Sequence, residues 1–316
     1  MLATAESGGD SDLLISGHRA ACVTDFYRGD FNQSREHGDR VLALYREEQH
    51  RYLADIMHVD PKTIVGIYAS LGTWMLGYPD RAVQLYDAND AHARRRGHPF
   101  DLGSALTWGS RIWDFRCEPE QILARAEEAE RLGRAHSLPF ISDVMAQIYK
   151  GIAWLRAGRL VEGIPHLRGA MERWNAAGGE NNMPYFRAVL AEGLALSGDL
   201  EGGLRLIEES LSEITRPGWE ERCHLAEVLR LKGWMLQQQE NLTAAEENYL
   251  ASRVVAREQQ AKSWELRTST SLAKLWQSQG KRKEALDLLK PVYDWFTEGF
   301  DTKDLKEAKA LLEELQ

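Results

Sequence analysis

Residues 151–174 read GIAWLRAGRLVEGIPHLRGAMERW, and this stretch contains the pattern that decides the fold. Gly158 marks a turn. One small residue, Gly151, lies seven positions before the turn, and another, Gly163, lies five positions after it. Apolar residues then recur at helical spacing, at Ile164, Leu167, Met171 and Trp174. The stretch therefore predicts two helices joined by a glycine turn, which cross closely at their small residues.

The same pattern recurs about every 40 residues along the chain. The turns are centred at Gly29, Gly77, Cys117, Gly158, Gly198, Glu240 and Gly280. Seven positions before each turn the residue is small: Cys22, Ser70, Ser110, Gly151, Ala191, Gly233 and Ala273. Five positions after it the residues are Ser34, Ala82, Ile122, Gly163, Gly203, Ala245 and Ala285. The one large residue, Ile122, follows the least regular turn, Cys117-Glu118-Pro119.

This arrangement resembles the tetratricopeptide repeat, which has small residues at its eighth and twentieth positions and glycine near the fifteenth. The resemblance covers roughly residues 16–295, although the usual repeat has 34 residues and these have about 40. It implies an all-α, right-handed α-solenoid of about seven antiparallel helix pairs. Each pair buries its apolar face only against its neighbours. The alternating, β-branched pattern of strands is absent.

The two ends of the chain complete the expected organisation. Residues 1–12 are polar and are expected to form a flexible leader, followed by the solenoid over 13–300. Gly299 is expected to end the helix that carries Trp295 and Phe296. Asp301 or Thr302 can then cap a last helix from Lys303 to Leu315, within a capping segment 301–316. The apolar stripe of that helix consists of Leu305, Ala308, Leu311, Leu312 and Leu315.

Composition limits the class of protein. A net charge of −9 opposes binding to nucleic acid through its phosphates. No stretch approaches the length of apolar sequence that spans a membrane, so neither nucleic acid nor membrane is expected as a partner. The three cysteines are far apart, without a C-x-x-C pair, which favours a reducing, cytoplasmic location and indicates neither a disulfide framework nor a zinc site.

Three segments carry a narrower resemblance: residues 259–315, WMLGYPDRAVQ at 74–84, and HVDP at 58–61. They resemble the C-terminal region of bacterial multidomain proteins that join an adenylate or guanylate cyclase, or another output domain, to a STAND-type or AAA-type NTPase. This chain has no G-x-x-x-x-G-K-[ST] loop to hold a nucleotide phosphate. The resemblance therefore implies a sensor region, either part of a larger protein or free-standing.

Solenoids of this kind bind their partners on the concave face, which the first helix of each pair lines. Positions in each repeat can be counted from its turn centre, and we call this count the repeat frame. It predicts that the binding face includes Trp74, Arg111, Asp114, Arg156, Tyr185, Glu192, Arg230, Arg267 and Lys274. Other residues expected on this face are Tyr27, Thr107, Glu227, Thr270 and Gln277. Arg230, Arg267 and Lys274 suggest a ligand with an acidic group, such as a peptide carboxylate. The alternative is that they are ordinary surface charges paired with Glu227 and Glu192.

Other candidate residues each have a structural interpretation beside the functional one. His58 and Asp60 resemble half of a metal or acid–base site, but Asp60 before Pro61 is favoured as a helix cap. Arg94, Arg95 and Arg96 could bind phosphate or an acidic peptide, but cations at a helix C-terminus are favoured as solvated partners of the helix dipole. Trp113, Trp154 and Trp276 each lie four residues before a turn centre and are expected in the core. Trp108, Trp219 and Trp264 do not occupy this position of the repeat and are candidates for ligand contact.

These observations favour a non-catalytic module that binds a protein or peptide, a sensor or regulatory scaffold in bacterial signalling, with no cofactor and no metal. The first alternative is an assembly element that self-associates into a homo-oligomer. The second is an enzyme that binds or hydrolyses a small molecule in the groove. It has little support, since the chain has no G-x-S-x-G or other catalytic signature.

Overall fold

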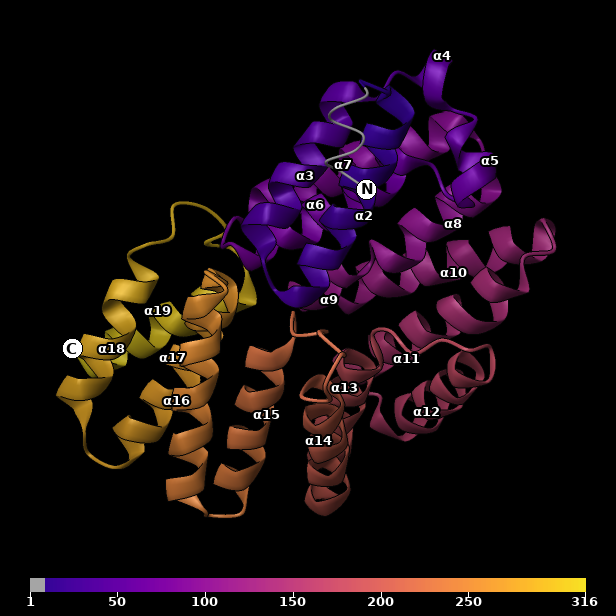
Figure 1. The fold of residues 1–316 in the computed structure, drawn as a ribbon. Coiled ribbons are helices and arrows are strands. Elements are labelled where there is room, and N and C mark those ends of the chain that lie inside the picture. The colour runs from indigo at the N-terminus through magenta and orange to yellow at the C-terminus, as the bar shows by residue number, and fades with distance from the viewer. Residues whose placement is uncertain (1–8) are drawn as a thin grey trace.

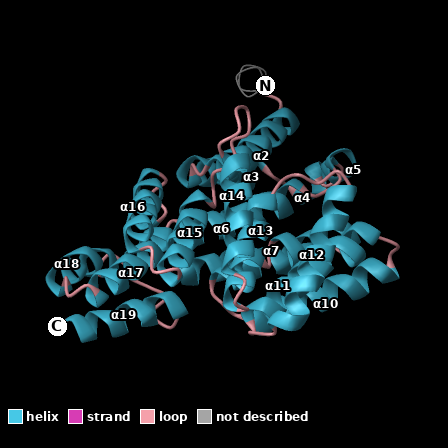
Figure 2. Cartoon of the chain, turned by 90° about the horizontal axis from the view of Figure 1, so that it is seen from below, coloured by secondary structure: helices cyan, strands magenta, loops and turns pink. Residues whose placement is uncertain are grey.

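The computed structural model describes residues 9–316, and this range is all-helical, with short connecting loops and no strand (Figures 1 and 2). The elements are α2 (Ser11–Arg28), α3 (Phe31–Leu44), α4 (Glu47–His50), α5 (Leu53–Met57), α6 (Pro61–Met75), α7 (Pro79–Arg96), α8 (Pro99–Trp108), α9 (Arg111–Phe115), α10 (Pro119–Ala135), the π-helix η1 (Phe140–Met145), α11 (Ala146–Arg156), α12 (Leu160–Ala176), α13 (Met183–Leu196), α14 (Leu200–Ile214), α15 (Leu225–Gln238), α16 (Leu242–Glu258), α17 (Lys262–Ser278), α18 (Arg282–Tyr293) and α19 (Lys303–Leu315).

The start of the first helix differs from the expected leader over residues 1–12. Residues 1–8 of that leader lie outside the described residues. Positions 11 and 12 already belong to α2, because the Asp10 side chain accepts hydrogen bonds from the backbone N–H groups of Asp12 and Leu13 and so caps the helix.

The predicted turns are confirmed. All seven turn centres have positive φ, from 57° at Cys117 to 98° at Gly198. Five of them are glycine, which enters this left-handed region without steric cost. The helices on either side of each turn pack against each other, so the chain is a series of neighbouring helical hairpins.

The small residues lie where paired helices approach closely. A Cβ atom added to Gly151 on α11 would lie 2.8 Å from the Cβ of Leu167 on α12. One added to Gly203 on α14 would lie 2.8 Å from the carbonyl oxygen of Ala191 on α13. Larger side chains would push the paired helices apart, which explains the recurrence of small residues at these positions.

The hairpins do not form an open arc. The array curves until its first and last parts meet, so that α17 packs against α6 (Figure 1). The Oγ of Ser263 donates a hydrogen bond to the carbonyl oxygen of Trp74 (2.5 Å), and the N–H of Cys223 donates one to the carbonyl oxygen of Tyr27 (3.0 Å). Beside them the rings of Trp74 and Trp264 lie edge to face with centroids 4.9 Å apart. Much of the concave face is therefore core.

The last helix lies where the sequence predicts it. α19 buries its stripe, including Leu305, Leu311 and Leu315, against α17 and α18. The expectation for the preceding segment is wrong, since α18 ends at Tyr293, before Trp295 and Phe296. Gly299 has another role: its φ is 76°, and an added Cβ would lie 2.0 Å from the Cγ of Pro79. It permits the chain to pass closely over the start of α7.

Within residues 9–316, none of the helices combines the length and apolar character that crossing a membrane requires.

Candidate functional site

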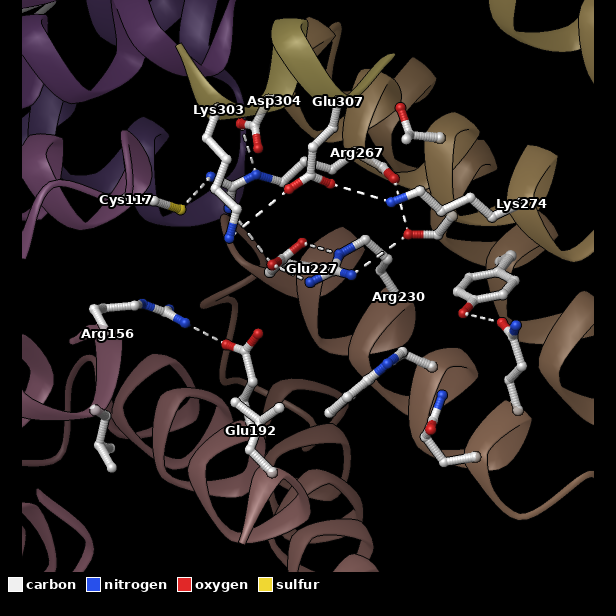
Figure 3. Close-up of a pocket in the computed structure, with 18 residues that line it drawn as sticks. Cys117, Arg156, Glu192, Glu227, Arg230, Arg267, Lys274, Lys303, Asp304 and Glu307 are labelled. Atoms are coloured by element: carbon white, nitrogen blue, oxygen red, sulfur yellow. Dashed lines mark hydrogen bonds and ion pairs between the residues drawn. The ribbon is translucent and has the colours of Figure 1, made fainter. Parts of the chain in front are cut away.

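A charged groove of about 540 Å³ remains open on the concave side. Its walls come from α11, α13, α15, α17 and α19, so residues from four successive hairpins and the last helix face one space (Figure 3). Charged side chains dominate the lining. The cations are Arg156, Arg230, Arg267, Lys274 and Lys303, and the carboxylates are Glu192, Glu227, Asp304 and Glu307.

Five residues of the predicted binding face lie together in this charged groove: Arg156, Glu192, Arg230, Arg267 and Lys274. Glu227 and Thr270, which the repeat frame also places on this face, line it too.

Four other predicted binding residues lie elsewhere, and the expectation that they are exposed is wrong. Trp74 and Asp114 are each 2% exposed, Tyr185 is 5% exposed and Arg111 is fully buried. The reason is the curvature of the array, which brings α6, α9 and α13 into contact with later elements. Arg111, for example, donates a hydrogen bond from Nη1 to the Asn182 side chain oxygen (2.7 Å).

Each labelled cation of the groove has a carboxylate partner within the protein (Figure 3). Arg230 forms a two-pronged pair with Glu227, at 2.7 and 2.8 Å. Lys274 Nζ lies 3.2 Å from Glu307 Oε2, and Arg156 pairs with both Asp114 and Glu192. Glu227 and Glu192 are the two carboxylates that the sequence analysis named as partners in its alternative interpretation, in which the basic residues are ordinary paired charges. The structure adds Asp304 and Glu307.

Arg267 joins three parts of the fold. Its Nε donates to Asp304 on α19 at 2.8 Å, and its Nη2 donates to the carbonyl oxygen of Phe115 on α9. Its guanidinium lies 5.1 Å from the ring centroid of Trp74 and 5.0 Å from that of Trp264, within cation–π range. Arg267 therefore connects the charged groove to the contact that closes the array.

Burial and pairing set the charge of these groups. Burial alone raises the pKa of Glu192, but the neighbouring Arg156 and Arg230 outweigh it, so the net pKa is lowered and the carboxylate is ionised at neutral pH. Burial raises the pKa of Asp304 in spite of Arg267. For Arg267, burial lowers the pKa, and the attraction of Asp304 and other neighbouring groups more than compensates.

An aromatic inner cavity of about 20 Å³ adjoins the charged groove. Rings of Phe115, Tyr185, His224 and Trp264 form much of its wall. Arg156, Glu227 and Arg267 line both spaces, so the inner cavity lies behind the groove wall.

Trp264, a candidate for ligand contact, is 2% exposed and forms part of the wall of the inner cavity. Trp108 and Trp219 are each half-buried: Trp108 packs edge to face on Trp174, and Arg216 lies 4.8 Å from the centroid of Trp219. Of the tryptophans expected in the core, Trp113 is buried, while Trp154 and Trp276 are half-buried.

Asp60 caps α6, as the sequence favours, since its carboxylate accepts from the N–H of Thr63 at 2.9 Å. It also pairs with His92 Nε2 at 2.9 Å and with Arg96 at 3.5 Å. Burial raises the pKa of Asp60, but hydrogen bonds from His92 and Tyr45 and the charge of Arg96 give a net lowering. Arg96 was expected to be a solvated cation at the helix C-terminus, and that interpretation is wrong, because its side chain is only 6% exposed and pairs with Asp60 and Asp101. Among residues 9–316, no cluster of three or more His, Cys, Asp or Glu side chains is arranged to hold a metal ion.

Sequence reasoning missed the contribution of α19 to the groove. The sequence analysis assigned only the apolar stripe of this helix. The available signal was the spacing of Asp304 and Glu307, which places both carboxylates along one edge of the buried stripe.

No protein-family model matches the chain, and no curated protein matches it.

Proposed function

We propose that this chain is a non-catalytic, tetratricopeptide-like, right-handed solenoid of about seven helix pairs, whose charged groove binds a protein segment or peptide with an acidic group. One observation carries the proposal: five residues chosen from the repeat frame line a single groove of about 540 Å³. A groove of that size accommodates several residues of an extended peptide. The biological role that we propose is a sensor or regulatory scaffold in bacterial signalling, in the cytoplasm.

Charge supports an acidic ligand. Five cations and four carboxylates line the groove, so its lining has a small excess of positive charge. Two of the carboxylates, Asp304 and Glu307, come from α19 rather than from the repeat helices. A ligand carboxylate can replace them on Arg267 and Lys274, which exchanges one ion pair for another instead of exposing a bare charge. Such an exchange avoids much of the desolvation penalty of forming a buried pair.

Thiol chemistry in the groove is disfavoured. Cys117 lines it, but burial raises the pKa of this thiol. Because the thiolate is the nucleophile, a raised pKa makes Cys117 a poor one. This supports binding over covalent catalysis at that residue.

The experiment is a selection of random dodecapeptides displayed on phage against the immobilised full chain. We expect enrichment of Asp and Glu, and we expect the selected peptide, measured by fluorescence polarisation, to lose about tenfold or more in affinity when its acidic residues become amides.

The matched variants are Arg230→Gln with Lys274→Gln in the groove, and Arg205→Gln with Lys283→Gln as the control. Arg205 and Lys283 are exposed and lie outside the groove. The groove variant should weaken binding and the control variant should not. Selected peptides without acidic residues, or equal binding by both variants, would overturn the proposal.

Self-association remains the second candidate, because α16 carries exposed apolar residues on its outer side. Leu250 is 40% exposed and Val254 is 56% exposed, one helical turn apart. Light scattering during size exclusion, at several concentrations, tests this candidate. A dimer that Leu250→Lys with Val254→Lys abolishes, and that Val161→Lys on α12 does not, would favour an assembly element.

A further inference from the structure

His224 is a buried side chain with no hydrogen-bond partner. It is 2% exposed and immediately precedes α15. Its ring stacks on Tyr185 with centroids 4.7 Å apart, and the rings of Phe115 and Trp264 lie around it at 5.9 and 6.4 Å. Neither Nδ1 nor Nε2 has a partner. Burial, helped by Arg111, lowers its pKa well below the usual value, so the imidazole is neutral.

Two unmet polar atoms in one buried ring are unusual, because buried polar groups almost always find a partner. Other buried polar atoms of the described residues also lack one, such as the Tyr149 hydroxyl and the Ser269 hydroxyl. Those atoms belong to side chains that line neither the charged groove nor the inner cavity. Within residues 9–316, His224 is the residue of this set that borders the inner cavity. His224 is therefore a side chain with unmet polar atoms that also borders open space.

The inner cavity limits what His224 can contact. Its volume of about 20 Å³ accommodates one water-sized group and excludes a ring. A neutral imidazole offers one N–H donor and one acceptor nitrogen. A hydroxyl or a primary carboxamide both donates and accepts, whereas an ammonium only donates and a carboxylate only accepts. The two ring nitrogens point to different sides of the ring, so one water-sized group meets only one of them. A hydroxyl serves whichever nitrogen borders the cavity, because it both donates and accepts. It also carries no charge that burial would penalise, whereas a carboxamide, with three heavy atoms, is too large for this space.

We propose that the inner cavity is a specificity subsite: it takes the hydroxyl group of a ligand whose acidic group lies on the cations of the charged groove. This proposal rests on the proposed function and names the ligand more closely, as an acidic peptide that carries Ser or Thr. Arg156, Glu227 and Arg267 line both spaces, so these side chains form the wall between them, and a ligand held in the groove lies next to the inner cavity.

His224→Phe separates a binding role from a structural one. Phenylalanine keeps a ring against Tyr185 and removes both unmet nitrogens, so the free protein should melt at a higher temperature. If His224 binds the ligand, the same variant should lose affinity. A gain in stability together with a loss of binding is the signature of a side chain kept for function.

The probe is the acidic dodecapeptide selected in the previous experiment, with Thr and then Val placed at each position in turn. These side chains have the same shape and differ in the hydroxyl. We expect one position at which the wild-type chain prefers Thr by about tenfold in fluorescence polarisation. His224→Phe should remove that preference. The control, Tyr149→Phe, removes a different unpartnered buried polar group, a hydroxyl whose side chain lines neither space, and should keep the preference.

The outcomes separate the two proposals. Acidic peptides that bind without any preference for Thr over Val, or a preference that survives His224→Phe, overturn the subsite and leave the proposed function standing. The subsite is also overturned if His224→Phe raises the melting temperature and leaves every affinity unchanged, because the cavity then holds only water. If no acidic peptide is selected at all, both proposals fall together.

Discussion

Replacing Gly151 with alanine tests the close helix crossing on which the fold prediction rests. Gly151 lies within α11, where an added Cβ would meet the Cβ of Leu167 at 2.8 Å, its Cα at 2.9 Å and its backbone nitrogen at 3.0 Å. Two of these three atoms belong to the backbone of α12. The new methyl group therefore cannot be accommodated by a side-chain rotation, and the two helices must separate.

A second glycine in the same hairpin gives the matched control. Gly169 lies inside α12, and an added Cβ there would meet only the mobile end of Arg173, at 3.7 Å. Both substitutions gain about 0.5–1 kcal/mol, because alanine favours a helix interior over glycine. Only Gly151→Ala carries the cost of overpacking, about 1–3 kcal/mol. The free energies of unfolding of the two variants should therefore differ by about 1–3 kcal/mol, with Gly169→Ala the more stable.

Urea unfolding followed by circular dichroism measures this difference. We expect Gly169→Ala to shift the midpoint to higher urea than wild type and Gly151→Ala to shift it lower. The reasoning is refuted if Gly151→Ala is as stable as Gly169→Ala, because the two helices would then not approach as closely as the repeat frame requires.

Three further results are expected. Burial raises the pKa of Glu221 from its ordinary 4.5 to about 8. Because the folded state then holds a proton that the unfolded state releases, the free energy of unfolding should fall by about 3–5 kcal/mol between pH 4.5 and 8. Urea midpoints measured across this range should fall less steeply for Glu221→Gln than for the wild type. Asp304→Asn should raise the affinity for the selected acidic peptide about threefold to tenfold, because it frees the guanidinium that this carboxylate occupies, whereas Glu313→Gln on the exposed side of the same helix should leave the polarisation titration unchanged. Gly299→Ala, which would collide with the start of α7, should speed amide hydrogen exchange there, while Gly218→Ala, with φ of 82° but open space around it, should not.

Local requirements made the hairpins predictable. A turn that needs positive φ favours glycine, and two helices that cross closely need small side chains at the crossing. Glycine and small residues therefore occur at fixed spacing in the sequence. The signal survives even where the residue type departs from it: Cys117 and Glu240 occupy turn centres and adopt φ of 57° and 62°.

The closure of the array was not predictable in this way. Trp74 and Tyr185 occupy concave-face positions in the repeat frame, yet both are buried. Whether a concave face stays open depends on small rotations summed over all neighbouring hairpins. No single residue determines the sum of these rotations. Counting positions in the repeat can therefore identify the residues of the concave face and still fail to predict whether they are exposed.

The candidate site was also predictable only in part. Arg230, Arg267 and Lys274 were expected to share a face, and they lie in one groove. The carboxylate of Asp304 was missed because an apolar stripe identifies the buried side of a helix but not the residues that its edges meet. His224 was missed because it lies just before α15, outside the positions that the repeat frame counts.

The contact between α6 and α17 also has a consequence for how the protein is made. The carbonyl of Trp74 and the hydroxyl of Ser263, which bond to each other, are 189 residues apart. A ribosome that adds about 5–20 residues per second needs about 10–40 s to make the second partner after the first. During that interval the indole of Trp74 lacks the cover that Trp264 and Arg267 provide in the folded protein. Where ribosomes follow one another closely on a message, α17 of a leading chain can reach α6 of the next. We therefore expect dense translation to be the condition under which this fold forms exchanged dimers.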